Sequence, residues 1–155
     1  MRFELVDRIV ELERGKRIVA VKAVSLAEEY LADHFPTFPV LPGVLILEAM
    51  VQAGAWLVRD AQNFAAPVVL LRQAKNVTYK SFVSPGNLLR LEVTCRRLER
   101  GESDFGGVGY CNQTEVVKAR FGLRHFSLQD REPSLAHLDR RIIDDARAQF
   151  ARLRR

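Results

Sequence analysis

The segment from Gly43 to Arg59, GVLILEAMVQAGAWLVR, constrains the fold of this chain more than any other. Pro42 precedes it and marks a helix start, and Glu48 and Gln52 are the only polar side chains before its end at Arg59. A helix that is apolar on every side is buried on every side. We therefore predict a central helix over 43–59, around which the rest of the 155-residue chain has to wrap.

Further segments have the pattern of β-strands and can supply this wrapping, because they alternate apolar and polar residues or are rich in strand-forming residues. Turn residues separate them, and Gly15 can adopt positive φ in the turn of the first hairpin. The expected strands span residues 5–12, 18–24, 68–79, 88–98, 104–112 and 116–126. A mostly antiparallel sheet around one helix is an α+β fold.

The length of the chain favours a single domain. We place it at residues 1–130 and interpret residues 131–155 as a charged helical extension of the same domain. A helix is expected over 133–155, and docking on its own domain is favoured over binding a membrane surface or a partner. Its apolar stripe between arginines consists of Leu138, Ile142, Ala146, Phe150 and Leu153.

Composition and charge argue against several function classes. Acidic residues interrupt the N-terminal segment, and the apolar run at 44–58 is too short for a bilayer, so we expect a soluble cytoplasmic protein. Cys95 and Cys111 have no metal-ligand spacing with any histidine, and no metal site is predicted. The net charge of +5 favours an acidic partner. Nucleic acid fits the charge, but no nucleic-acid motif is present.

Glu48 is the most informative residue of the central helix. A buried carboxylate loses solvation, so burial is expected to raise the pKa of Glu48. Gln52 lies one turn later on the same face and can hydrogen-bond near the same position. Two interpretations remain open: Glu48 has a chemical task, or it forms a buried structural pair with an arginine.

His34 lies in the proline-rich loop DHFPTFPVLP at 33–42, immediately before this helix. An imidazole is the usual side chain for accepting a proton near neutral pH. The backbone N–H groups of Gly43 and Val44 have no partner within the helix and can stabilise an oxyanion. A base, an oxyanion site and the acid Glu48 together suit proton abstraction next to a thioester carbonyl, followed by loss of a β-hydroxyl group.

These residues belong to a longer motif: HFP at 34–36, PVLPGVL at 39–45, EAM at 48–50 and Gln52. The motif resembles that of the 3-hydroxyacyl-acyl carrier protein dehydratases of the FabA/FabZ class. The resemblance extends upstream through LVDR at 5–8 and GKRIVA at 15–20, and downstream through YK at 79–80 and PGNL at 85–88. Glutamate at position 48 resembles the FabZ branch, since the dehydratase-isomerase branch typically has aspartate there.

The resemblance implies a hot-dog fold and an enzyme that dehydrates a (3R)-3-hydroxyacyl thioester on acyl carrier protein to the trans-2-enoyl thioester, without metal or organic cofactor. It implies a homodimer whose sheets join, and the class also includes trimers of dimers. His34 and Glu48 of one catalytic site would come from different chains, and the acyl chain would lie in an apolar tunnel beside the central helix. The implied oxyanion and substrate-binding residues are Gly43, Val44, Gln52, Phe35 and Phe38.

The acidic carrier protein is expected to contact Arg96, Arg97 and Lys80. Adjacent strand residues face opposite sides of a sheet, so only one of the two arginines is expected to make this contact. Asp33 and Thr37 replace glycines that the class usually has. Two alternatives stay open: a hot-dog acyl thioesterase, and a non-catalytic acyl-binding paralogue.

Overall fold

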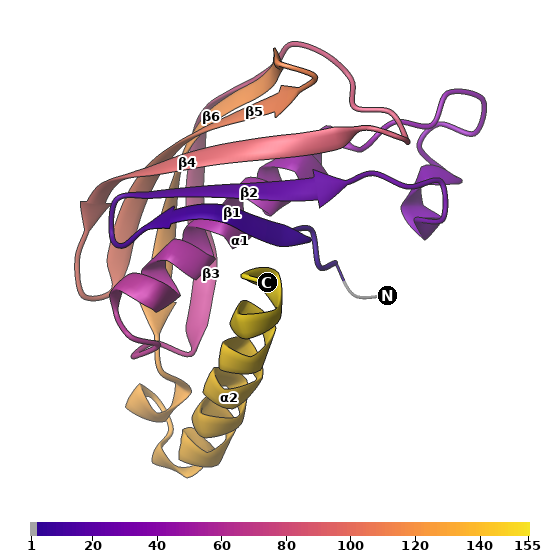
Figure 1. The fold of residues 1–155 in the computed structure, drawn as a ribbon. Coiled ribbons are helices and arrows are strands. Elements are labelled where there is room, and N and C mark those ends of the chain that lie inside the picture. Colours follow the sequence, from indigo (N-terminus) through magenta and orange to yellow (C-terminus); the bar gives the residue numbers. More distant parts are fainter. Residues whose placement is uncertain (1–2) are drawn as a thin grey trace.

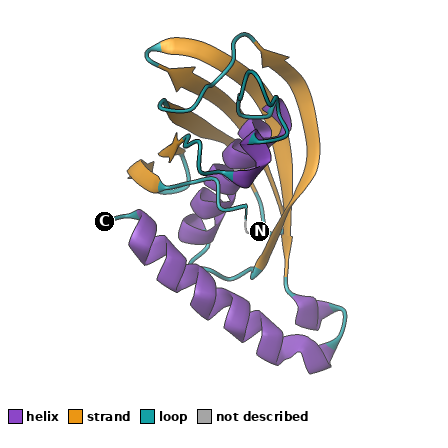
Figure 2. Ribbon diagram, turned by 90° about the vertical axis from the view of Figure 1, so that its right-hand side faces the viewer, coloured by secondary structure: helices purple, strands orange, loops and turns teal. Residues whose placement is uncertain are grey.

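In a computed structural model that describes residues 3–155, a curved sheet wraps around one long helix (Figures 1 and 2). The sheet has six strands in the order β1-β2-β4-β5-β6-β3, and every pair of neighbours is antiparallel. The strands are β1 (Arg8–Glu13), β2 (Arg17–Ala23), β3 (Val68–Tyr79), β4 (Leu88–Leu98), β5 (Glu102–Cys111) and β6 (Thr114–Phe126). The predicted α+β class is confirmed.

Helix α1 (Gly43–Ala61) lies against the concave face of this sheet. Inward-facing residues of the strands and ten buried residues of α1 form the core. The helix approaches the sheet closely at Gly54, where an ideal Cβ atom would lie 3.0 Å from the ring of Phe121. Phe121 in turn stacks on Phe105 of β5, with ring centroids 5.3 Å apart.

The expectation that α1 is buried on every side is wrong for its first turns. The side chain of Val44 is 72% exposed, and Glu48 is only partly buried. The reason is geometric: the sheet covers α1 from one side, and the loop at 33–42 passes in front of its N-terminus without covering the opposite side.

Helix α2 (Ala136–Leu153) follows two short 3₁₀ turns, Leu128–Asp130 and Pro133–Leu135. Phe150 packs against Trp56 of α1 and against Phe64, with ring centroids 5.8 and 5.6 Å apart. The buried carboxylate of Asp139 accepts hydrogen bonds from the backbone N–H groups of Leu128 and Gln129. These contacts fix α2 beside the C-terminal half of α1. No helix within residues 3–155 is long and apolar enough to cross a bilayer.

Strand β3 is one edge of the sheet, and β6 is its only neighbour within the described chain. Its twelve residues include Leu70 and Leu71, whose side chains are 52% and 42% exposed. A long exposed strand edge with apolar side chains is a surface on which another strand can pair.

A third short 3₁₀ turn, Glu29–Leu31, precedes the loop that carries His34.

Candidate active site

The loop before α1 folds back on itself and holds the imidazole of His34 in one orientation. Phe35 and Phe38 exchange backbone hydrogen bonds of 3.2 and 3.0 Å, and the N–H of Val40 donates to the carbonyl of His34. The Nδ1 atom of His34 lies 3.1 Å from the carbonyl oxygen of Val40. Because a carbonyl can only accept, Nδ1 carries the proton and donates it. Nε2 is thereby left as the nitrogen that can accept a proton from a substrate.

A cavity of about 420 Å³, here called the His34 cavity, opens beside this imidazole. Phe35 stacks on His34 with ring centroids 4.2 Å apart. Phe38 does not line the cavity, and its ring packs edge-on against that of Phe82. Most of the lining is apolar, which suits a thioester and the first part of an acyl chain. The lining residues are His34, Phe35, Val40, Leu41, Gly43, Ile46, Tyr79, Lys80, Ser81 and Phe82.

The N-terminus of α1 has backbone donors beside the same cavity, which Gly43 lines. Leu45 and Ile46 donate to the carbonyl of Pro42, whereas Gly43 and Val44 have no acceptor for their N–H groups within residues 3–155. An N–H group at this end of a helix is suited to a negatively charged oxygen. The predicted oxyanion donors are therefore unoccupied by other parts of the described chain.

Tyr79 at the end of β3 holds this helix start in place. Its hydroxyl donates a 2.9 Å hydrogen bond to the carbonyl of Gly43. An ideal Cβ atom on residue 43 would lie only 2.9 Å from two ring carbons of Tyr79, so this packing requires glycine. Burial raises the pKa of the Tyr79 phenol above its ordinary value, so the hydroxyl stays protonated and can donate. The sequence motif included Tyr79 but did not indicate this contact.

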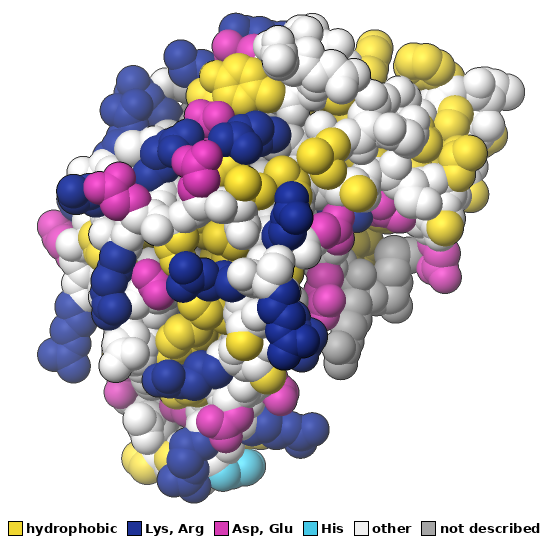
Figure 3. All heavy atoms as spheres, in the orientation of Figure 1, with side chains coloured by type: hydrophobic (Ala, Val, Ile, Leu, Met, Phe, Trp, Pro, Cys, Tyr) yellow, Lys and Arg dark blue, Asp and Glu magenta, His cyan; other side chains and the backbone are white. Residues whose placement is uncertain are grey.

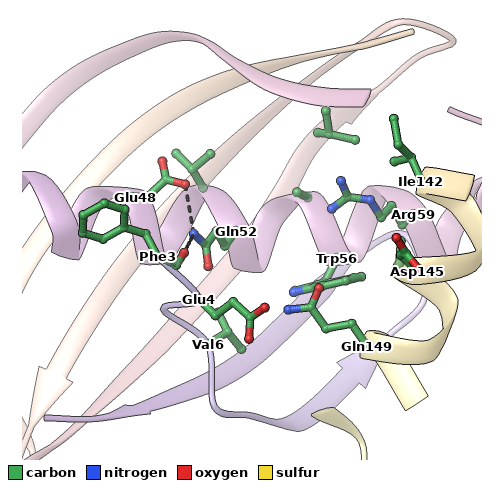
Figure 4. A pocket seen from close by; sticks show the side chains of 14 residues that line it. Phe3, Glu4, Val6, Glu48, Gln52, Trp56, Arg59, Ile142, Asp145 and Gln149 are labelled. Carbon is green, nitrogen blue, oxygen red and sulfur yellow. Dashed lines mark hydrogen bonds between the residues drawn. The ribbon is translucent and has the colours of Figure 1, made fainter. Parts of the chain in front are cut away.

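Glu48 opens into a second cavity of about 380 Å³, here called the Glu48 cavity (Figure 4). Gln52 donates from Nε2 to the carboxylate of Glu48 at 3.0 Å and to the carbonyl of Phe3 at 2.7 Å. Its Oε1 accepts the N–H of Leu5 at 2.9 Å. Both amide hydrogens and the amide oxygen of Gln52 are thus engaged within the protein. Gln52 orients Glu48 and fastens the N-terminal segment to α1. Of the two interpretations of Glu48, the pairing with an arginine is not observed in the described residues.

His34 and Glu48 do not meet within one chain. They line different cavities, and no contact between them is formed among residues 3–155. Ile46 faces the His34 cavity, and Glu48 comes two residues later, which is about 200° around a helix. The two candidate catalytic groups therefore belong to opposite sides of α1.

The expectation that Arg96 and Arg97 face opposite sides of the sheet is wrong, because a β-bulge between Cys95 and Arg97 shifts the register. Arg97 forms three ion pairs, at 2.6 Å with Asp104, 3.1 Å with Glu99 and 3.5 Å with Glu102. Hydrogen bonds to Asp104 and Glu99 raise the pKa of the Arg97 guanidinium above its ordinary value. Its charge is therefore largely compensated.

Arg96 is exposed, and its guanidinium lies over Gly106 on the same outer face, beside Lys75 and Arg120. The third candidate for carrier binding, Lys80, forms a 2.8 Å ion pair with Glu115. On the face shown in Figure 3, lysine and arginine side chains alternate with acidic ones, so the net positive charge forms no uniform patch there. Among the three candidates, Arg96 is the cation without an ion pair in the described residues.

Metal-ligating residues do not cluster in the part of the chain that the structure describes: no group of three or more His, Cys, Asp and Glu side chains is placed to hold an ion. Cys95 and Cys111 are both free thiols, and burial raises the pKa of each.

Comparison with protein families shows that residues 1–120 match the model of the FabA-like domain. The 3-hydroxyacyl-[acyl-carrier-protein] dehydratase FabZ of Symbiobacterium thermophilum is 43% identical over 128 residues, which cover 83% of this chain and 88% of that protein. The protein of the same name from Geobacillus thermodenitrificans is 42% identical over 122 residues, covering 76% and 84%.

Solved structures show the same fold at low sequence identity. The dehydratase heterocomplex ApeI:P from Xenorhabdus doucetiae superposes with a TM-score of 0.68 at 17% identity, covering 86% of this chain and 90% of that chain. The PaaI protein of E. coli superposes with a TM-score of 0.58 at 11% identity, covering 77% and 78%. The expected hot-dog fold is confirmed.

Proposed function

The chain belongs to the family of FabA-like domains, and we propose that it dehydrates a (3R)-3-hydroxyacyl thioester carried on acyl carrier protein. The observation that carries this proposal is the set of groups around α1. A histidine with a free Nε2, two unoccupied backbone donors and a carboxylate held by an amide are the groups that such an elimination needs.

In this mechanism the thioester carbonyl accepts hydrogen bonds from the N–H groups of Gly43 and Val44, which stabilise the enolate as it forms. Nε2 of His34 removes the proton from the carbon next to the carbonyl. The electron pair then forms the carbon–carbon double bond, and Glu48 gives its proton to the departing hydroxyl group, which leaves as water. A proton returned from His34 to Glu48 through solvent restores both groups.

Each complete site is proposed to use two copies of the chain. His34 and Glu48 lie on opposite sides of α1, so a single chain cannot bring them to one substrate. A second copy can place its His34 loop against Glu48 and cover the exposed Val44. Pairing of two β3 edges would join the sheets and bury Leu70 and Leu71.

The carrier protein is proposed to bind through Arg96 rather than Arg97. Acyl carrier protein is acidic, and an uncompensated surface cation attracts it more strongly than one already surrounded by carboxylates.

Within the site, Gln52 orients Glu48 instead of contacting substrate, because its amide has no free group. We propose that Phe35, which lines the His34 cavity, and the exposed Val44 contact the thioester end of the substrate. A substrate on acyl carrier protein implies that the enzyme works in the cytoplasm.

The test is to incubate the full chain with a 3-hydroxyacyl thioester on acyl carrier protein. We expect an enoyl thioester, which absorbs in the ultraviolet, with no release of thiol. Release of free thiol would identify a thioesterase, and binding without either product would identify a non-catalytic acyl-binding protein. The variant His34→Ala is the matched control, since it removes the base and leaves the carrier-binding face unchanged.

A further inference from the structure

The Glu48 cavity extends far beyond Glu48. Along α1 its lining includes Glu48, Ala55 and Arg59, which lie on one face of the helix. The eleven positions from Glu48 to Arg59 correspond to about 16 Å at 1.5 Å per residue. Figure 4 shows Glu48 at one end of this cavity and Arg59 at the other, with Trp56 between them. The cavity thus has the shape of a channel that leads away from the proposed acid.

Helix α2 closes the far end of this channel. Ile142 and Ala146 contribute apolar surface, and Asp145 and Gln149 lie beside Arg59 in the same wall (Figure 4). This helix lies outside the residues that match the family model, which end at 120. The far end of the channel is therefore formed by residues outside the family match.

Within residues 3–155 no carboxylate forms an ion pair with the guanidinium of Arg59. This guanidinium stacks on the ring of Trp56 at 5.0 Å, and its Nε–H is shielded from solvent without a hydrogen-bond acceptor among residues 3–155. Burial lowers the pKa of Arg59, and no neighbouring carboxylate offsets this effect. A cation withdrawn from water without a partner is unfavourable, so buried cations are normally paired with an anion.

Asp145 is the one carboxylate of α2 in this wall, and it is not an ion-pair partner of Arg59. Its carboxylate is further than 4.0 Å from the guanidinium, since no ion pair joins them within the described residues. The side chain of Asp145 is exposed and can remain hydrated at the rim. Glu4, also in the lining, is exposed, and no ion pair joins it to Arg59. The position next to Arg59 inside the channel is left for a ligand.

We infer that Arg59 binds the far end of the acyl chain, and that this chain ends in a carboxylate rather than a methyl group. The inference rests on the proposed function, because that function places the reacting carbons at Glu48 and directs the rest of the chain along the channel. Val51, Ala55 and Trp56 provide apolar surface for the middle of such a chain. The substrate class is then the mono-thioester of a 3-hydroxy dicarboxylic acid.

The test measures binding and turnover separately. Saturated pantetheine thioesters of matched chain length, one ending in a methyl group and one in a carboxylate, are titrated calorimetrically into the full chain over a series of lengths. Hydrogen bonds to charged groups predict that the carboxylate form binds about ten- to hundredfold more tightly at the best length. Equal binding, tighter binding of the methyl form at every length, or binding of neither would overturn the inference.

Variants then assign the preference to Arg59. Arg59→Met keeps the stem over Trp56 and removes the charge, so the preference is expected to disappear, while Arg59→Lys is expected to keep part of it. Asp145→Asn is the matched control: it removes a competing negative charge and is expected to keep or increase the preference. A preference that survives in a folded Arg59→Met variant would refute the assignment.

Turnover distinguishes this inference from the proposed function. The corresponding 3-hydroxyacyl thioesters are assayed for formation of the enoyl product. If neither is dehydrated while the carboxylate preference in binding holds, the proposed dehydration fails and the binding site stands. If both are dehydrated and the methyl form binds as tightly as the carboxylate form, the proposed function stands and the inference fails.

Discussion

Replacing Gly43 by alanine tests whether contact with Tyr79 sets the position of the oxyanion donors. The new Cβ atom would lie 2.9 Å from two carbons of the Tyr79 ring. Carbon atoms in favourable contact are about 3.5 Å apart or more, so the ring or the helix start has to move by about 0.6 Å. A misplacement of about 1 Å at a site can reduce turnover about a hundredfold, so a shift of this size predicts a loss of about tenfold in kcat.

The free energy of unfolding is expected to change much less. The hydrogen bond from Tyr79 to the Gly43 carbonyl contributes about 1 kcal/mol, and alanine is favoured over glycine within a helix by about 0.5–1 kcal/mol. Weakening this hydrogen bond lowers the free energy of unfolding, whereas the helix preference of alanine raises it. Tyr79 is 47% exposed, so a displacement of about 0.6 Å at its contact with the helix start disturbs little of the core. Denaturant titration is therefore expected to place Gly43→Ala within about 1 kcal/mol of the parent protein.

The assay compares kcat for the parent, Gly43→Ala, Tyr79→Ala and the double variant. If the ring transmits the effect, Gly43→Ala costs about tenfold when Tyr79 is present and little when the ring is absent. Tyr79→Phe serves as the control that removes only the hydroxyl, with an expected loss of about fivefold. An equal cost of Gly43→Ala in both backgrounds would show that the contact with Tyr79 does not position the donors.

Three further predictions follow from the same geometry. His34→Ala and Glu48→Gln should each lower kcat by about two orders of magnitude or more. When the two variants are refolded together, about half of the randomly paired dimers are mixed and each mixed dimer has one intact site, so about a quarter of all sites should regain activity. Proven subunit exchange without recovery would exclude a site shared between chains. Arg96→Glu should raise KM for carrier-bound substrate but not for a pantetheine substrate, more so at low salt. Arg97→Glu should mainly lower the denaturation midpoint, because it leaves Glu99 and Glu102 unpaired and leaves Asp104 with Arg72 alone; equal KM effects would contradict this distinction. Burial lowers the pKa of His125, despite the opposing influence of Glu102, so this group contributes stability that is present above its ordinary pKa of about 6.5 and is lost as the pH falls below that value. Denaturant titration of His125→Gln should therefore show a smaller loss of stability between about pH 7.5 and pH 5.5 than the parent protein shows. An unchanged loss would assign the pH dependence to other groups.

Local sequence patterns predicted most of the fold. The bounds of β3 and β4 agree with the prediction, because β3 is rich in strand-forming residues, β4 alternates, and the SPGN turn at 84–87 lies between them. Strand β5 begins two residues earlier than expected, at Glu102, directly after Gly101 with its positive φ. Helix α2 begins at Ala136 because Pro133 starts a 3₁₀ turn instead.

The candidate site was less predictable, because its geometry depends on residues far apart in the sequence. The motif located His34 and Glu48 but could not show that they face separate cavities. The bulge that places both arginines on one face arises from pairing between β4 and β5, so strand alternation wrongly predicted that Arg96 and Arg97 face opposite sides. The isolation of Arg59 depends on α2, which lies more than seventy positions later. No local pattern encodes such contacts.

The Glu48 cavity also has a consequence for the order in which the protein is assembled during synthesis. One of its walls is the segment containing Phe3, which Gln52 fastens to α1, and another is α2 near the opposite end of the printed sequence. A nascent chain emerges from the ribosome N-terminal segment first. The sheet and α1 can therefore form before the channel exists, and α2 completes it last. A ligand that spans the channel binds only the state with α2 docked, so by mass action it should slow amide exchange in α2 more than in the sheet.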